Sequence, residues 1–418
     1  MERRLPRWSE LRSLMRFEPP TLDRRAARLS RAADLWDLRR IARRRTPRPA
    51  FDYTDGAAQR ELTRERSRQA FDSVELLPRI LHGIAAPDLS TTIAGSRSAL
   101  PFGIAPTGFT RFMHADGETG GVRAAQRAGI PFTLSTMGTR SIEEVAAAGP
   151  GATRWFQLYL WKDRARSRDL LERAAASGYG TLLVTVDTPV AGQRLRDVRN
   201  GMVIPPKLTL RTLADASHRP EWWVNFLTTD PLTFASLSGT SADLPTITNA
   251  MFDPALSFED LEWIRSEWPG QLFVKGVLTR EDASRSRAAG ADGLVVSNHG
   301  GRQLDRAPAS LHALPEVRDE VGADVELILD SGVMSGADVI TALCAGADFV
   351  LIGRAYLYGL MAGGQAGVER AIELLAEEIR ISMQLMGAAS VRDLGPELLG
   401  TRHHPDLRRR AAVTDRPG

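Results

Sequence analysis

The chain has 418 residues, of which 43% are hydrophobic and 25% are charged, a composition typical of a folded globular protein. No run of eighteen apolar residues occurs, and the amino terminus lacks the apolar core of a secretory signal. We therefore expect a cytoplasmic protein without a membrane span. The single cysteine, Cys344, excludes an internal disulfide and any cysteine-based metal cluster, and its apolar helical context predicts a packing role.

The net charge of +3 conceals a basic amino-terminal segment. Residues 1–50 contain 15 Arg against 6 Asp and Glu, an excess of 9 positive charges, which leaves the remainder at −6. Basic arms bind nucleic acid, anionic lipid headgroups or an acidic partner. Few aromatic residues interleave these arginines and no nucleic-acid fold motif follows, so we expect no nucleic acid as a partner. The arm either packs on the protein's own body or contacts a membrane surface.

The first hundred residues read as this basic arm followed by a helical extension. Residues 30–45 place Leu35, Leu38 and Ile41 on one face, which predicts a helix that ends before Pro47 and Pro49. The segment FDYTDGAAQRELT, residues 51–63, then leads into another helical stretch. We expect residues 1–100 to pack as one layer on the unit that follows.

From residue 101 onward, short apolar runs of strand length alternate with amphipathic helical segments. Eight such runs occur, at residues 101–107, 130–136, 154–160, 181–189, 271–276, 292–298, 325–330 and 348–353. Eight parallel strands, each followed by a helix, close as an α/β (βα)8 TIM barrel more naturally than as an open doubly wound sheet, which is the alternative. We expect the barrel to span residues 101–393 and residues 394–418 to form a mobile tail, in which His403 and His404 are too few for a metal site, so that no metal is expected.

A long excursion, residues 190–256, interrupts the barrel after its fourth strand. It contains a cluster of aromatic residues, Trp222, Trp223 and Phe226, ahead of the helix-like segment FEDLEWIRSEW. Such a cluster forms a lid over the site, a subunit contact, a foothold on a membrane, or simple packing on the rim of the barrel.

Functional groups of such barrels lie at the carboxyl ends of the strands. At the sixth strand's end, His299 stands three residues before Arg302, with Gly300 and Gly301 between them. An imidazole base beside a carboxylate receptor favours proton abstraction from a small organic acid. The other ends also carry polar or glycine-rich groups: Ala105, Pro106 and Thr107, then Ser135, Gln157 and Tyr159, Thr185 and Asp187, Lys275, Asp330 and Gly332, and Gly353 with Arg354.

Two of these ends leave different chemistries open. Glycines and Arg354 after the last two strands predict a phosphate site, and hence a phosphorylated ligand. Lys275, buried at a strand end, either forms a Schiff base with a carbonyl substrate, as in an aldolase, or lies as a fixed cation beside a flavin.

The segments FDYTDGA, IAPTG, FQLY, TVDTP, LRDVRN, FVKG, SNHGGRQLD and IGR, in this order, resemble the FMN-dependent L-2-hydroxy-acid dehydrogenase and oxidase family. The resemblance runs from about residue 34 to residue 393 and is strongest to bacterial FMN-linked L-lactate dehydrogenases. It implies a substrate base at His299, oriented by Asp187. It further implies that Arg302 and Arg194 hold the substrate carboxylate and that Tyr53 and Tyr159 hydrogen-bond the substrate.

The resemblance also implies how FMN is held. Ala105, Pro106 and Thr107 belong to the strand end that faces its reactive edge, and Ser135, Gln157 and Thr185 bond the pyrimidine side. Lys275 is the cation that favours the anionic reduced flavin. Asp330 bonds the ribityl chain, and the phosphate is surrounded by Gly332, Gly353 and Arg354.

Three departures from the family pattern bear on function. Gly108 follows Thr107 as in mandelate dehydrogenase, which favours a quinone or cytochrome acceptor over oxygen; Met137 replaces a tryptophan of glycolate oxidases. At the phosphate, Ser331 and Met334 stand where the family typically has glycine and arginine.

From these residues we expect FMN-dependent oxidation of L-lactate to pyruvate. The alternatives are an oxygen-using oxidase that releases hydrogen peroxide and an FMN enzyme that acts on a peptide-derived redox carrier. By resemblance we expect a homo-oligomer, a tetramer, that is cytoplasmic or peripheral on the inner face of the cell membrane.

Overall fold

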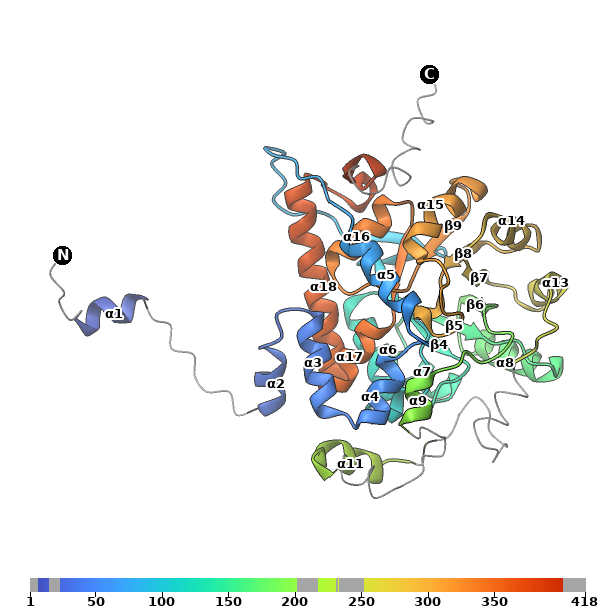
Figure 1. The fold of residues 1–418 in the computed structure, drawn as a ribbon, viewed down its shortest axis with the longest axis horizontal. Coiled ribbons are helices and arrows are strands. Elements are labelled where there is room, and N and C mark those ends of the chain that lie inside the picture. Colours follow the sequence, from blue (N-terminus) through green and yellow to red (C-terminus); the bar gives the residue numbers. More distant parts are fainter. Residues whose placement is uncertain (1–6, 15–22, 201–216, 231, 233–251, 401–418) are drawn as a thin grey trace, which may run out of the picture.

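The computed structural model describes residues 7–14, 23–200, 217–230, 232 and 252–400 (Figure 1). Eight parallel strands close into a barrel in the order β10-β3-β4-β5-β6-β7-β8-β9, which confirms the predicted (βα)8 fold. Each strand falls on one of the eight predicted spans, with bounds β3 Phe102–Ile104, β4 Phe132–Ser135, β5 Arg154–Leu158, β6 Thr181–Thr185, β7 Gln271–Val277, β8 Gly293–Val296, β9 Glu326–Leu329 and β10 Phe349–Ile352.

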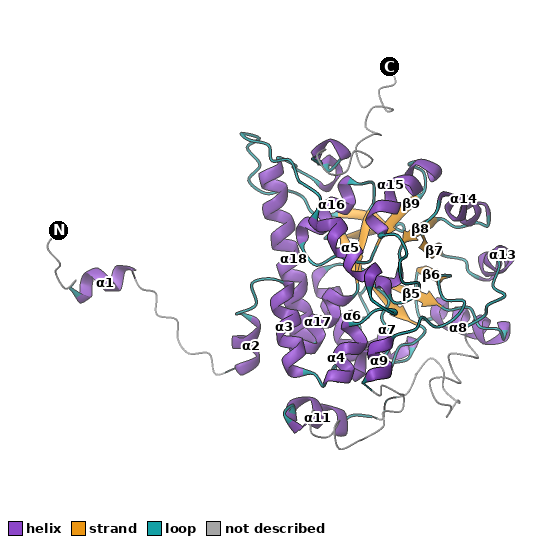
Figure 2. Cartoon of the chain, viewed as in Figure 1, coloured by secondary structure: helices purple, strands orange, loops and turns teal. Residues whose placement is uncertain are grey.

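Helices surround this barrel (Figure 2). The sequence predicted these helices, because apolar residues recur at helical spacing and several segments end in glycine. Helix α6, for example, ends before Gly129, whose φ of +66° suits a glycine C-cap. Cys344 is fully buried at the end of α16, as its context predicted. The helices that follow the strands are α6 Gly117–Ala128, α7 Ile142–Ala148, α8 Arg164–Ala176, α13 Phe258–Glu267, α14 Arg280–Ala288, α15 Ser310–Val321, α16 Gly336–Cys344, α17 Arg354–Gly363 and α18 Gln365–Met386.

Large apolar side chains fill the inside of the barrel, where Trp155, Phe273 and Phe349 pack against one another with ring centroids 6.0 and 6.4 Å apart. A small hairpin, β1 Thr91–Ile93 and β2 Ser96–Ser98, adds Ile93 and Ala94 to this inner cluster. The sequence did not predict the hairpin, whose strands are only three residues long. The cluster makes the barrel a packed core, so ligands are confined to its rim.

The helical extension packs on α17 and α18 and consists of α2 Arg24–Leu29, α3 Leu35–Arg45, α4 Arg48–Asp55 and α5 Leu62–Asp72, after α1 Trp8–Leu14. The helix predicted over residues 30–45 begins only at Leu35, because the Asp34 side chain accepts from the Asp37 N–H and caps the helix there. Buried Leu35 and Leu38 face α17, so this part of the basic arm packs on the protein's own body.

The excursion after β6 contains α9 Leu195–Arg199 and α11 Pro220–Leu227, while residues 201–216, 231 and 233–251 lie outside the described part. In α11, Trp222 donates from Nε1 to the Phe112 carbonyl at 3.0 Å and stacks on Phe226, so one face packs on the rim at the short helix η1 Thr110–Phe112. The opposite face exposes Val224 and Leu227 by 59% and 71%. No helix in the described residues is long and apolar enough to cross a membrane.

Residues 394–400, which were expected to belong to a mobile tail, are part of the packed chain. Leu398 and Leu399 are both 1% exposed, and Leu399 forms a bridge with Leu76, so the packed chain continues to residue 400 through the short helices η4 Val391–Asp393 and η5 Pro396–Leu398. The prediction missed this because so short an apolar pair carries no periodicity. Residues 401–418 lie outside the described part.

Candidate active site

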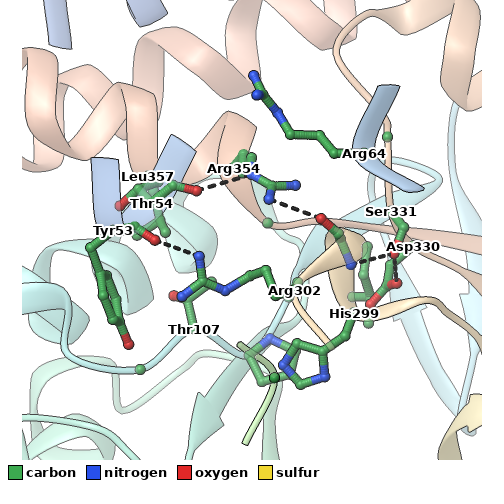
Figure 3. A pocket seen from close by; sticks show the side chains of 18 of the residues that line it. Tyr53, Thr54, Arg64, Thr107, His299, Arg302, Asp330, Ser331, Arg354 and Leu357 are labelled. Carbon is green, nitrogen blue, oxygen red and sulfur yellow. Dashed lines mark hydrogen bonds between the residues drawn. The ribbon is translucent and has the colours of Figure 1, made fainter. Parts of the chain in front are cut away.

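A cavity of about 950 Å³ lies at the carboxyl ends of the barrel strands, within the size range of small-molecule sites (Figure 3). Every residue that the sequence assigned to the catalytic, substrate or cofactor site lines this cavity except Asp187, which contacts the lining residue His299. Those lining residues are Tyr53, Ala105, Pro106, Thr107, Ser135, Gln157, Tyr159, Thr185, Arg194, Lys275, His299, Arg302, Asp330, Gly332, Gly353 and Arg354.

His299 follows β8 in the short helix η3 His299–Gly301 and has a φ of +56°, an uncommon backbone conformation outside glycine. The Ser297 hydroxyl accepts from the His299 N–H at 3.1 Å and the Ser331 hydroxyl accepts from the Gly300 N–H at 2.9 Å, which fixes this turn. His299 Nδ1 lies 2.9 Å from Asp187 Oδ1, and Nε2 lies 3.5 Å from the Tyr159 hydroxyl. The second ring nitrogen therefore faces the cavity.

Asp187 keeps a negative charge beside this imidazole. Burial alone would raise the pKa of the Asp187 carboxyl, but the charge and hydrogen bond of His299 and the charge of Lys275 outweigh burial and lower it. A carboxylate here holds a proton on Nδ1 and leaves the lone pair of Nε2 toward the cavity. The pair is thus arranged as a base and its orienting group.

Two guanidinium groups meet at the same end of the cavity. Arg302 donates to the Tyr53 carbonyl, and its Cζ lies 4.8 Å from the centroid of the Tyr53 ring; Arg194, the N-cap residue of α9, lies 5.7 Å from the same centroid. Burial and the charge of Arg194 lower the pKa of Arg302 to about 10. Since each cation is unfavourable for the other, an anion between them would relieve their repulsion. This end of the cavity suits a carboxylate.

Two buried polar groups, in β5 and β6, test whether a flat polar cofactor fits the cavity. Gln157 Nε2 and Thr185 Oγ1 have no hydrogen-bond partner among the described residues, although both side chains are at most 2% exposed. Gln157 Oε1 accepts from the Ser135 hydroxyl at 2.9 Å, which aligns the amide at the strand end. Buried polar groups without partners are uncommon in native proteins, so these two indicate a bound polar ligand, and the amide and carbonyl groups of a flavin ring match them.

Lys275, in β7, is held as a fixed cation. Its Nζ donates to the Ser297 hydroxyl at 2.8 Å and pairs with Asp330 Oδ2 at 3.0 Å, and these partners follow β8 and β9, the next two strands of the barrel. An ammonium group in such a pair suits a cation beside an electron-rich cofactor and does not favour the Schiff-base alternative, which needs a neutral amine.

After β10, Arg354 begins α17 next to Gly353. Most of the N–H groups of its guanidinium already donate to backbone carbonyls. Its Nε donates to the Thr54 carbonyl at 2.9 Å, and its Nη2 donates to the carbonyls of Gly56 and Gly300 at 2.8 and 2.9 Å (Figure 3). Ser331 has a φ of +79°, which explains why glycine suits this position. Met334 is buried and carries no charge.

Several residues that also line the cavity had no predicted role. Two of them, Arg64 and Arg68 of α5, stand four residues apart on one helical face, a spacing that was readable but that arginine-rich helices usually present to solvent. The other lining residues without a predicted role include Trp36, Glu65, Gln69, Asp197, Val198, Phe252, Leu357 and Tyr358. The extension and excursion therefore contribute more of the wall than the motifs indicated.

Comparison with known proteins identifies the family to which the chain is similar. Residues 42–401 match the family described as FMN-dependent dehydrogenase. A Mycobacterium tuberculosis protein, whose name gives L-lactate dehydrogenase as a provisional assignment, is 53% identical over 98% of each chain. The L-lactate dehydrogenase of Ectopseudomonas mendocina is 42% identical over 87% of this chain and 97% of its own. The crystal structure of a monotopic membrane protein, (S)-mandelate dehydrogenase, superposes with a TM-score of 0.85 at 34% identity, over 88% of this chain and 99% of its own.

Proposed function

This chain belongs to the FMN-dependent dehydrogenase family, and from that premise we propose that it oxidises L-lactate to pyruvate. The observation that carries the proposal is the 2.9 Å contact of His299 with Asp187 in a cavity that also holds Arg302 and Arg194. Oxidation of a small 2-hydroxy acid requires a base, a carboxylate that orients the base, and cations that bind the carboxylate of the substrate.

His299 takes a proton from the substrate at Nε2. Oxidation of the hydroxy acid removes two electrons and two protons, and bound FMN supplies the acceptor for the electron pair. Whichever bond of the substrate breaks first, one proton passes to Nε2, and the Asp187 carboxylate stabilises the imidazolium that results. Tyr159 remains a neutral donor, because burial and the charge of Asp187 raise the pKa of its phenol.

Arg302 and Arg194 bind the substrate carboxylate, and Tyr53 lies against both guanidinium groups. The residues that would hold FMN line the rest of the cavity. They are Ala105, Pro106, Thr107, Ser135, Gln157, Thr185 and Lys275 along the ring, Asp330 at the ribityl chain, and Gly332, Gly353 and Arg354 at the phosphate.

The proposed electron acceptor is a quinone or a cytochrome. Gly108 packs so closely on Met137 that a Cβ at position 108 would lie 2.7 Å from the Met137 Cβ. These two residues, which both depart from the family pattern, are therefore in direct contact. The proposal of a dehydrogenase is supported by Gly108 and by the likeness to mandelate dehydrogenase.

We further propose a homo-oligomer, in the first place a tetramer, that is peripheral on the inner face of the cell membrane. Its support is the monotopic neighbour and the apolar face of α11, where Val224 and Leu227 are exposed beside the basic helices α2 and α3. Flotation of the purified chain with anionic vesicles tests the membrane part, and binding that is absent at every salt concentration would contradict it.

The function is tested by anaerobic titration of the flavin-loaded protein with L-lactate, D-lactate, mandelate and glycolate, followed by oxygen or a soluble quinone. We expect L-lactate to bleach the flavin with one pyruvate per flavin, D-lactate to leave it oxidised, and quinone to reoxidise it faster than oxygen. Rapid release of hydrogen peroxide would instead establish an oxidase. A flavin that no simple 2-hydroxy acid reduces would overturn this substrate class and favour an unusual substrate such as a peptide-derived redox carrier.

A further inference from the structure

Arg64 lies outside the barrel, in α5, yet it lines the same cavity as Gly332 and Arg354. Its backbone also closes against the turn that carries His299, because a Cβ at Gly301 would lie 2.8 Å from the Arg64 nitrogen. The helical extension thus forms part of the wall of the cavity.

Guanidinium groups gather around this wall. Arg39, Arg64 and Arg196 share the two carboxylates of Asp55 and Glu61. Arg64 also acts on Arg354, because its charge contributes to lowering the pKa of that residue. A phosphate monoester, which carries about −1.5 to −2 charges at neutral pH, would be attracted to such a group of arginines.

Arg64 is the member of this group that is held least tightly by protein. Its contacts to Glu61 and Asp55 measure 3.2 and 3.4 Å, longer than those that Arg39, Arg196 and the Tyr358 hydroxyl make with the same two carboxylates. Both carboxylates are shared with Arg196, at 2.5 Å to Glu61 and 3.0 Å to Asp55. The two carboxylates therefore compensate Arg64 and Arg196 together, and the charge of Arg64 is not fully neutralised.

The two other arginines at this end are already engaged. Arg354 donates to three backbone carbonyls, and burial together with the charge of Arg64 lowers its pKa. Arg68 forms a bidentate pair with Asp338 at 2.5 and 2.7 Å and donates to the Gly332 carbonyl at 2.8 Å. Arg68 therefore holds the loop after β9 in place, while position 334 in that loop offers only a thioether.

We propose that Arg64 is a cofactor-binding residue that supplies to the FMN phosphate the positive charge that Met334 does not provide. This inference rests on the proposed FMN-dependent function. The side chain reaches the cavity from the helix that precedes the barrel, so the phosphate end of the site is completed by the extension and not by the barrel loops alone.

The test compares FMN with riboflavin, which has the same ring and ribityl chain but no phosphate. The full-length chain is freed of flavin, and the dissociation constant for each compound is measured by quenching of flavin fluorescence. We expect Arg64→Gln to weaken FMN binding at least about tenfold, the loss of one charge-assisted hydrogen bond, while riboflavin binding stays within about twofold. Arg64→Lys, which keeps the charge, should lose less than about threefold for FMN.

Arg66 provides the matched control, since it lies on the same helix, is exposed and does not border this cavity. Arg66→Gln removes the same charge and should leave both dissociation constants unchanged. Unaltered FMN binding in Arg64→Gln would overturn the inference, and so would an equal loss of FMN and riboflavin, which would show a merely structural role. Failure of the unmodified chain to bind either flavin would contradict the FMN assignment itself, a result distinct from both.

Discussion

The two ends of the cavity are built in different ways. At the substrate end, His299, Asp187 and Arg302 come from strand ends of the barrel, and each contacts its partner directly. At the phosphate end, Arg354 donates to backbone carbonyls and the remaining charge comes from Arg64 of the extension. The base and its orienting carboxylate are thus fixed by the barrel, whereas Arg302 and the proposed anchoring of the cofactor both depend on a layer that packs on it from outside.

Asp55 links the extension to the excursion and to α17, because it is 1% exposed and accepts from Arg39, Arg196 and the Tyr358 hydroxyl. We expect Asp55→Asn to lower the free energy of unfolding by about 3 kcal/mol, since it leaves partly buried guanidinium groups without their buried counter-charge. Urea unfolding measures this. Asp72→Asn is the control, because Asp72 is an exposed partner of Arg68 and its loss should cost less than about 1 kcal/mol.

The stability that Asp55→Asn loses should depend on pH. Burial acts to raise the pKa of Asp55, but the hydrogen bond from Arg39, the charge of Arg64 and the hydrogen bond from Tyr358 hold it well below its usual range. A carboxyl whose pKa is lowered by folding stabilises the protein above its unfolded pKa of about 3.9, and that stability is lost as the pH falls. The difference between the unmodified chain and Asp55→Asn should therefore be full at pH 7 and shrink below about pH 4. A difference that grows on acidification would contradict the account.

Arg302→Lys tests the substrate end alone. Lysine keeps the charge but loses the planar fork, so we expect the KM for L-lactate to rise about tenfold to thirtyfold, equivalent to roughly 2 kcal/mol, while FMN affinity is unchanged. Steady-state kinetics and flavin titration measure the two quantities. Arg306→Lys, at an exposed position of the same loop, should change neither. Loss of FMN affinity in Arg302→Lys would show that the two ends are not separable.

Ser331 should give the smallest effect. Its positive φ is unfavourable for serine, but its hydroxyl accepts from the Gly300 N–H and donates to Asp330 at 2.8 Å. Ser331→Ala keeps the backbone strain and loses both hydrogen bonds, so we expect it to cost about 1 to 2 kcal/mol of stability. Ser331→Gly loses the same bonds but relieves the strain, so its cost should be smaller. Thermal unfolding of the pair decides, and a glycine variant less stable than the alanine variant would refute this explanation.

The sequence predicted the substrate end more completely than the phosphate end. Strand periodicity placed all eight barrel strands, and the carboxyl ends of parallel strands necessarily meet, which brought His299 and Arg302 to one rim. Arg64 could not be found in this way, because an arginine on an amphipathic helix is usually solvated and only tertiary packing turns it toward the cavity. The hairpin β1–β2 was missed for a related reason, since three-residue strands leave no readable pattern.

Capping likewise decided where some elements begin. Asp34 starts α3 five residues later than its apolar periodicity indicated, because a short side chain that satisfies a backbone N–H outweighs the helix propensity of the residues before it. The packing of Leu398 and Leu399 against the extension is set by the tertiary fold and has no local signature.

The most direct test of the central claim is anaerobic stopped-flow reduction of the flavin by L-lactate in His299→Gln. Glutamine removes the base while retaining a polar side chain of similar reach, so FMN should remain bound with an unchanged dissociation constant. We expect the rate of flavin reduction to fall by about 10² to 10⁴, the range that a positioned general base contributes. Reduction at the rate of the unmodified protein would contradict the assignment of His299 as the group that takes the substrate proton.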